Sequence, residues 1–328
     1  MRKIGIDGFV IALICAVLAA WIYPALGTMR SPVSLSLVTD IGIAGIFFFY
    51  GLRINPTQMR TGVSNWKLHI LIQLTTFVLF PVLIFLTMLL VPEAKDSLLW
   101  VGIFYVAALP STVSSSVLMV SIGRGNIPAA IFNASLSSIL GVVLTPLLMR
   151  FFLSQAHGGI ANFGDILLRL LWQIVLPLTA GFLLHRILSN LAEKYKRCLR
   201  LFEKTVIVLI VYTAFSNSFS EGIFSNYSLW TILGVAFGML LLFTVIYWTV
   251  KMVCKLLRFS LEDSITAIFC GSKKSLVHGS AMAKVLFQNI ASSGLILMPI
   301  MMYHIIQLIV VGIIATKLSR RTGASKVF

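Results

Sequence analysis

The stretch GSKKSLVHGS, residues 271 to 280, places Lys273, Lys274 and His278 inside an apolar run that extends from ITAIFC to AMAKVLF. At a rise of about 1.5 Å per residue, Lys274 lies about 18 Å into a helix that begins near Glu262. An ionisable side chain at that depth is costly unless it faces protein or water, which makes it a candidate functional residue. The alternative is a structural cation that pairs with backbone carbonyls freed by a helix break. In either case the stretch predicts an interrupted helix inside an apolar protein.

The composition indicates a membrane protein. Of the 328 residues, 59% are hydrophobic and 11% are charged, so a soluble domain would lack the polar surface to cover itself. The net charge of +16 comes from basic residues between the apolar runs, where lipid contact and topology explain it better than a nucleic-acid partner. The four cysteines are scattered and predict neither a metal site nor disulfides, and no other cofactor is indicated.

We predict ten membrane-spanning helices and no cleaved leader, since the first apolar run is long and lacks a cleavage site. Of the 26 Lys and Arg residues, 19 fall in alternate connectors and the termini, 5 fall on the other side, and the remaining 2 are Lys273 and Lys274. This split predicts that both termini are cytoplasmic and that the loop near residues 221–226 is external. The predicted spans are 7–26, 33–52, 66–91, 97–120, 127–152, 163–187, 204–219, 228–254, 262–286 and 292–317.

Two halves of five spans each would lie in opposite directions in the membrane, as in the inverted repeats of secondary transporters. The halves would be residues 1–152 and 153–328. The fourth span of each half contains polar, helix-weakening residues, LPSTVSSSV at 109–117 and CGSKKSLVHGS at 270–280. An interrupted helix needs neighbours for its freed backbone groups, so both spans should line a protein cavity.

The hydroxyl side chains that follow Pro110 are candidate ligands for Na⁺, and helix ends at such a break suit an anion. The alternative is that serine and threonine pack helices and bond to their own backbone. Isolated amides such as Gln73 and Asn217 are better explained as interhelical hydrogen bonds. Asp40 is the one carboxylate well placed as an intramembrane counter-charge, and the alternative is that it lies near the outer interface. The candidate substrate and ion ligands are Ser111, Thr112, Ser114, Ser115, Ser116, Asn133, Ser135, Ser138, Ser272, Lys273, Lys274, Ser275, His278 and Gln73.

The sequence resembles the bile-acid:sodium symporter superfamily, solute carrier family 10, and within it the member-7-like branch. The resemblance covers nearly the whole chain and rests on stretches such as FFYGLRI, LPSTVSSSVLMVSIGRGN, NASLSSILGVVLTPLL and CGSKKSLVHGSAMAK. It implies an all-α fold of ten transmembrane helices with two inverted repeats. Helices 3–5 and 8–10 would form a core domain in which helices 4 and 9 are broken and cross, and helices 1, 2, 6 and 7 would form a panel domain.

The resemblance also implies candidate sodium ligands at Ser115, Ser116, Ser135 and Ser138. Sodium-coupled members carry a Glu-x-Gly-x-Gln-Asn pattern in the ninth helix, where this chain has Phe269, Cys270, Gly271, Ser272, Lys273 and Lys274. The carboxylate is therefore missing and lysines replace the amides. We expect a lysine ammonium to occupy the place that sodium would have filled.

These features predict a secondary transporter that moves a small organic anion by alternating access. Its coupling would be to protons, or to sodium with a reduced requirement. The expected location is the plasma membrane, which in a bacterium is the inner membrane. The first alternative is a membrane sensor or regulator that keeps the transporter fold and binds without transport. A membrane-embedded enzyme is disfavoured because no catalytic set of residues is evident. We expect membrane lipid as a partner and do not expect nucleic acid. The sequence does not define the oligomeric state.

Overall fold

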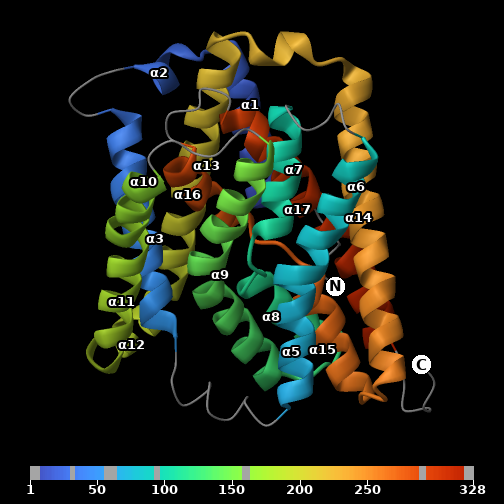
Figure 1. Ribbon diagram of the computed structural model, residues 1–328. Coiled ribbons are helices and arrows are strands. Elements are labelled where there is room, and N and C mark those ends of the chain that lie inside the picture. The colour runs from blue at the N-terminus through green and yellow to red at the C-terminus, as the bar shows by residue number, and fades with distance from the viewer. Residues whose placement is uncertain are drawn as a thin grey trace.

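The computed structural model describes residues 8–29, 34–54, 65–91, 97–156, 163–287 and 293–320, and every regular element in these ranges is a helix (Figure 1). In the first half the elements are α1 (Gly8–Ile22), α2 (Ala25–Thr28), α3 (Leu35–Arg53), α5 (Trp66–Leu74), the π-helical turn η1 (Thr75–Leu79), α6 (Phe80–Leu90), α7 (Leu98–Ala108), α8 (Ser114–Ile122) and α9 (Ile127–Ala156). In the second half they are α10 (Phe163–Leu170), the π-helical turn η3 (Leu171–Val175), α11 (Leu176–Leu183), α12 (His185–Lys194), α13 (Lys196–Ser220), the 3₁₀ turn η4 (Ile223–Asn226), α14 (Leu229–Leu256), α15 (Leu261–Gly271), α16 (Leu276–Leu286) and α17 (Ser293–Ser319). Residues 1–7 and 321–328, which the sequence predicts to be cytoplasmic, lie outside the described ranges.

Five helical segments in the described part of the chain are long and apolar enough to cross a membrane. A sixth candidate is the pair of segments Leu168–Leu183 and His185–Lys194, which meet at a bend of 95°. The molecular surface agrees with a lipid environment, since Leu90, Trp230 and Phe237 are 82%, 81% and 67% exposed. Large exposed apolar surfaces of this kind mark membrane or protein contact. The five segments are Leu35–Arg53, Trp66–Leu90, Ile127–Leu153, Leu229–Leu256 and Ser293–Ser319.

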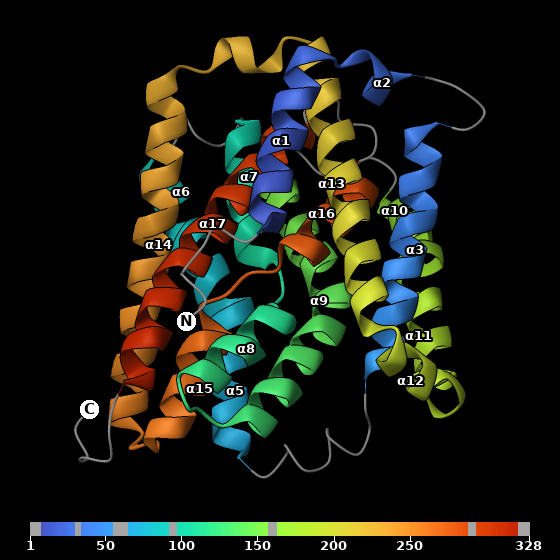
Figure 2. The same cartoon turned by 180° about the vertical axis from the view of Figure 1, so that it is seen from behind.

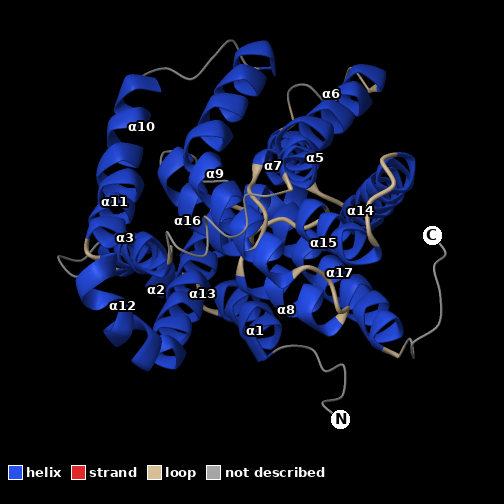
Figure 3. Cartoon of the chain, turned by 90° about the horizontal axis from the view of Figure 1, so that it is seen from below, coloured by secondary structure: helices blue, strands red, loops and turns tan. Residues whose placement is uncertain are grey.

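The helices pack in two groups that meet along α13. In one group α1 and α3 pack on α13, and α3 also packs on α11 (Figure 2). In the other, α7 packs on α9 and α17, and α15 packs on α5, α8, α9 and α14. Contacts of α13 with α16 and α17 join the groups. The view from below shows the short helix α15 in the interior of the second group and α8 at its edge beside α17 (Figure 3).

Two glycines allow α3 and α11 to approach at backbone contact distance. A Cβ atom added at Gly51 would lie 2.1 Å from the carbonyl oxygen of Leu178, and one at Gly181 would lie 2.0 Å from that of Phe48. Small residues at a helix crossing allow this close packing inside membranes. The crossing fixes the position of the C-terminal end of α3, which carries Arg53.

Both predicted helix interruptions are present. Helix α7 ends at Ala108, and Leu109 is extended (φ −74°, ψ 152°), as expected for a residue that precedes a proline. Helix α15 ends at Gly271, and α16 begins after Ser275, whose side chain accepts a hydrogen bond from the His278 amide as an N-cap. The connector predicted at 188–203 is helical, divided between α12 and α13, and α12 turns sharply away from the preceding helix.

Candidate functional site

The two helix breaks are in direct contact and hold each other. The Ser275 amide donates to the Pro110 carbonyl at 2.9 Å, and the Ser111 hydroxyl donates to the Cys270 carbonyl at 2.6 Å. Backbone groups that lose their helical partner at one break therefore find partners at the other. The fold brings residues 109–113 and 272–275, more than 150 residues apart in the chain, into one polar centre.

Lys274 lies at the middle of this centre, with its side chain fully buried. Its Nζ donates to the carbonyl oxygens of Thr76 at 2.7 Å, Ala107 at 2.7 Å and Leu109 at 2.8 Å. The same nitrogen lies 4.1 Å from the centre of the Phe80 ring, which is cation–π geometry. An ammonium has three N–H donors, so each donor has an acceptor and no carboxylate is required.

Helix geometry explains why these three carbonyls are available. The last carbonyls of α7 have no intrahelical partner, and they form the partially negative end of that helix. Thr76 belongs to the π-helical turn η1, where the regular hydrogen-bond ladder of the third span is interrupted. Lys274 therefore caps two irregular backbone segments at once.

Helix α17 fixes the backbone of the second break. The side chain of Gln307 accepts from the Lys274 amide and donates to the Lys274 carbonyl, both at 2.8 Å. The Tyr303 hydroxyl donates to the Ser272 carbonyl at 2.6 Å. Sequence reasoning missed Tyr303 and Gln307, although a glutamine four residues after a tyrosine on an apolar helix is a signal for one shared polar face.

Lys273 is also fully buried, and it points to a different neighbour. Its Nζ donates to the Ser115 carbonyl in α8 at 2.8 Å. Lys273 and Lys274 lie in the non-helical segment between α15 and α16, where adjacent side chains point in different directions, so the two lysines serve different halves of the first break. Lys274 caps the end of α7, and Lys273 contacts the start of α8.

The predicted hydroxyl ligands divide into two sets. Thr112 shares hydrogen bonds of 2.8 Å with both Ser115 and Ser116. In contrast, Ser135 and Ser138 line a cavity, and Ser138 also donates to the carbonyl of Ala134. The first set is thus engaged within the break, whereas the second faces open space.

The other predicted ligands have structural partners. The Ser137 hydroxyl accepts from the Ser111 amide at 2.9 Å, and the Ser272 hydroxyl donates to Ile268. Gln73 donates to the backbone and side chain of Asn133 across the α5–α9 contact, which confirms the interhelical hydrogen bond expected for this amide. The Ser275 hydroxyl lies 3.0 Å from Nδ1 of His278, whose ring also packs against Tyr50.

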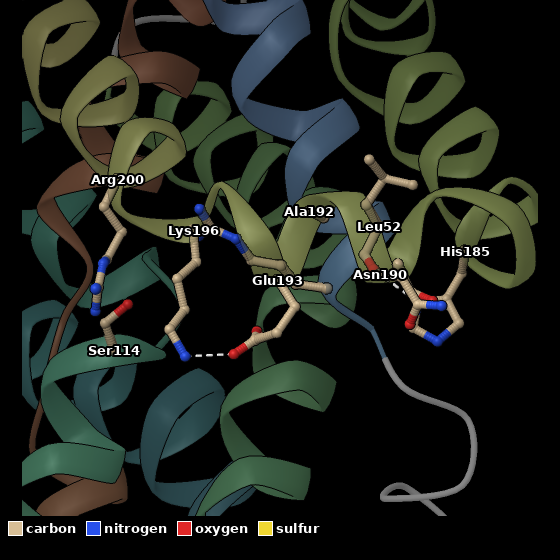
Figure 4. Close-up of a pocket in the computed structure, with 10 residues that line it drawn as sticks. Leu52, Ser114, His185, Asn190, Ala192, Glu193, Lys196 and Arg200 are labelled. Carbon is tan, nitrogen blue, oxygen red and sulfur yellow. Dashed lines mark hydrogen bonds and ion pairs between the residues drawn. The ribbon is translucent and has the colours of Figure 1, made fainter.

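Two adjoining cavities open beside these breaks. The smaller, of about 80 Å³, is lined by His278, Tyr50, Ser135 and Ser138 among others. The larger, of about 460 Å³, lies against α12 and the start of α13 (Figure 4). Arg53 and Ser114 line both cavities and so mark the junction between them. The larger volume is in the range of sites for small organic molecules.

The larger cavity has a predominantly basic lining. Arg53 pairs through Nη1 with Glu203 at 3.3 Å, and Lys196 forms an ion pair with Glu193. The hydrogen bond from Lys196 holds the pKa of the Glu193 carboxyl below its usual range. Arg200 adds a further cation, and in Figure 4 its side chain extends towards Ser114.

A second ion pair lies near the N-terminal end of α3. Asp40 binds Lys284 of α16 at 2.7 Å, and Lys284 also donates to the Ser36 carbonyl and the Thr39 hydroxyl. Asp40 is therefore the counter-charge of Lys284, whereas the described contacts of Lys273 and Lys274 are with backbone carbonyls. The described residues contain no group of three or more His, Cys, Asp or Glu side chains that could hold a metal ion.

Comparison with known proteins gives consistent matches over nearly the full length. The sequence model of the SBF-like CPA transporter family matches residues 7–320. The chain is 39% identical over 316 residues to "Uncharacterized protein PA2026" of Pseudomonas aeruginosa, covering 96% of this chain and 93% of that protein. It is 34% identical to "Putative symporter YfeH" of Escherichia coli, covering 97% and 94%. It is 30% identical to "Sodium/bile acid cotransporter 7-B" of Xenopus laevis, covering 94% and 90%.

Proposed function

Because this chain belongs to the SBF-like CPA transporter family, in the member-7-like branch of the bile-acid:sodium symporter superfamily, we propose that it is a secondary active transporter of a small organic anion. The observation that carries the proposal is the pair of helix breaks in contact beside two cavities with a basic lining. Substrate sites of secondary transporters form in this way, between discontinuous helices near the middle of the membrane.

The proposed architecture has ten spans in two inverted repeats, residues 1–152 and 153–328. The group around α5 to α9 and α14 to α17 would be the core domain, and the group around α1, α3, α11 and α13 would be the panel domain. The charge distribution of the sequence supports cytoplasmic termini and, in a bacterium, an inner-membrane location. In this orientation the larger cavity opens to the cytoplasm, because it is lined by α12 and the C-terminal end of α3. Transport would proceed by movement of one group of helices against the other.

The proposed coupling does not need two sodium ions. The ammonium of Lys274 already binds three carbonyl oxygens, which are the hard oxygen ligands that a sodium ion would use. The remaining candidates for an ion are the hydroxyls of Ser115, Ser116, Ser135 and Ser138. Coupling would then be to protons, or to sodium with a reduced requirement.

The test is uptake by purified protein in liposomes, after a thermal-shift screen of organic anions has identified a ligand. We expect uptake of that anion in sodium-free buffer, increased by an inward proton gradient. Strict dependence on sodium with no effect of pH would contradict the proposed coupling. Saturable binding without any uptake would favour the sensor function, which keeps the same site without transport.

A further inference from the structure

The junction between the two cavities contains an arginine whose hydrogen-bonding capacity is only partly used. Arg53 is the last residue of α3, and its Nη1 is paired with Glu203. Its Nη2 is buried and has no hydrogen-bond partner among the described residues. A buried donor without a partner is unfavourable, and a charged one more so. Other atoms of the Arg53 side chain, which is 29% exposed, line both cavities.

The start of α8 lies at the same junction and adds to its positive potential. Ser114 is exposed at the first position of α8, and no side chain caps the amides of this helix end. Free amides and the helix dipole make such an end favourable for an anion. The observation is independent of Arg53, because the two groups come from different helices.

Arg200 approaches this junction from α13. Its side chain extends towards Ser114 in Figure 4, whereas the neighbouring Lys196 is paired with Glu193. Two guanidinium groups, one hydroxyl and one helix end thus surround the junction. The Glu203 carboxylate is already bound by Nη1 of Arg53, and the Glu193 carboxylate of the larger cavity is paired with Lys196. This arrangement suits a planar or tetrahedral oxyanion, which arginine binds through paired hydrogen bonds.

We infer that Arg53, Arg200 and Ser114 bind the acid group of the substrate, an organic carboxylate, sulfonate or phosphate, with its organic part in the larger cavity. The inference rests on the proposed function and specifies its substrate class. The competing role for Arg53 is purely structural, as an ion pair that joins α3 to α13 through Glu203. The two roles differ in their use of the guanidinium N–H donors other than Nη1, which a lysine at this position would lack.

The test uses full-length purified protein and four benzene derivatives that share one ring: benzoate, benzenesulfonate, phenylphosphate and neutral benzyl alcohol. We expect at least one anion to raise the thermal midpoint and to bind saturably at millimolar concentration, and we expect benzyl alcohol to have no effect. The three anions distinguish among the acid groups. Absence of binding by all three, or equal binding of benzyl alcohol, would overturn the inference.

The variants separate binding from structure. Arg53→Lys keeps the charge and the ion pair with Glu203 and should weaken anion binding about tenfold, while the thermal midpoint without ligand stays near that of the wild type. Glu203→Gln removes the ion pair and should retain anion binding. Arg186→Lys is the matched control, since Arg186 is exposed and lines neither cavity. Unchanged affinity in Arg53→Lys, or a loss in Glu203→Gln alone, would assign Arg53 the structural role.

Uptake into liposomes distinguishes this inference from the proposed transport. Binding that depends on Arg53 without any uptake would overturn transport and retain the site. Uptake that is insensitive to Arg53→Lys would retain transport and overturn the site.

Discussion

The two ends of α3 carry opposite charges and meet different surroundings. Near the N-terminal end, Asp40 is paired with Lys284 of α16, and the lysine has further acceptors in Ser36 and Thr39. At the C-terminal end, Arg53 faces two cavities and keeps a buried nitrogen without a partner among the described residues. One end of the helix is thus bound to the opposite group of helices, and the other end borders open space.

If the protein transports by alternating access, as proposed, this difference indicates which contacts change between its conformations. A transporter that alternates must close the cavity at Arg53 and separate α3 from α16 at Asp40. The close contact of α3 with α11 through Gly51 and Gly181 should move with α3, because its backbones are too close to slide independently. The Asp40–Lys284 pair is therefore expected to stabilise the conformation seen here.

The largest expected effect comes from preventing that separation. Cysteines at positions 40 and 284, joined by a short bis-maleimide in a background without the exposed Cys15 and Cys198, should abolish uptake. Anion binding at the Arg53 end should survive, because the cavities remain open. The uncross-linked double variant is the control, and full uptake after complete cross-linking would mean that α3 and α16 do not separate.

Lys274→Ala should have the next largest effect. It removes the side chain at the middle of the polar centre formed by the two helix breaks. Three carbonyl acceptors would lose their partner, which should lower the free energy of unfolding by about 3 kcal/mol or more. Ligand binding should be lost with it, because both breaks depend on this residue for their geometry. Thermal unfolding in detergent measures the first effect, and the anion titration measures the second.

Lys273→Ala is the control for that change. It removes a lysine from the adjacent position but leaves only one acceptor, the Ser115 carbonyl, without its partner. We expect about one third of the loss, near 1 kcal/mol. Equal destabilisation by both variants would show that burial of the lysine stem, and not the number of carbonyls bound, determines the stability.

Much of this centre could be predicted from the sequence, because its signals are local. Pro110 and the lysines at 273 and 274 mark both breaks in the sequence. The partners could not be predicted. Asp40 and Lys284 are 244 positions apart, and Lys274 binds backbone carbonyls, which carry no residue-specific signal. In the sequence, Arg53 is only one of the basic residues whose distribution predicts topology, because nothing near it in the chain predicts a cavity.

Removing the Asp40–Lys284 pair without a cross-link should have a moderate effect. Lys284→Met keeps an apolar side chain of similar length but loses the charge. The conformation in which α3 is bound to α16 therefore loses about 1 kcal/mol of stabilisation. Labelling of a cysteine at position 36 by a membrane-impermeant maleimide should become faster, because this end opens more often. Asp40→Asn should also make the labelling at position 36 faster. Slower labelling in both variants would contradict the assignment of this pair to the closed end.

The smallest expected effect concerns the other lysine–carboxylate pair, Glu193 with Lys196, which lies at the cavity end on α12 and the start of α13. Both side chains are largely exposed, at 71% and 56%, so water and salt screen their attraction. Lys196 lowers the pKa of the Glu193 carboxyl, so any stabilisation is present above the usual glutamate pKa and is lost as the pH falls through the lowered value. Glu193→Gln should therefore leave the thermal midpoint at neutral pH unchanged within error, and any difference from the wild type should decrease below about pH 4.3 and disappear once the pH is below the lowered pKa of Glu193. Anion binding should be equal or stronger in this variant, because the lining of the larger cavity loses a negative charge. A marked loss of stability at neutral pH would mean that this pair holds α12 in place as Asp40 and Lys284 hold the other end.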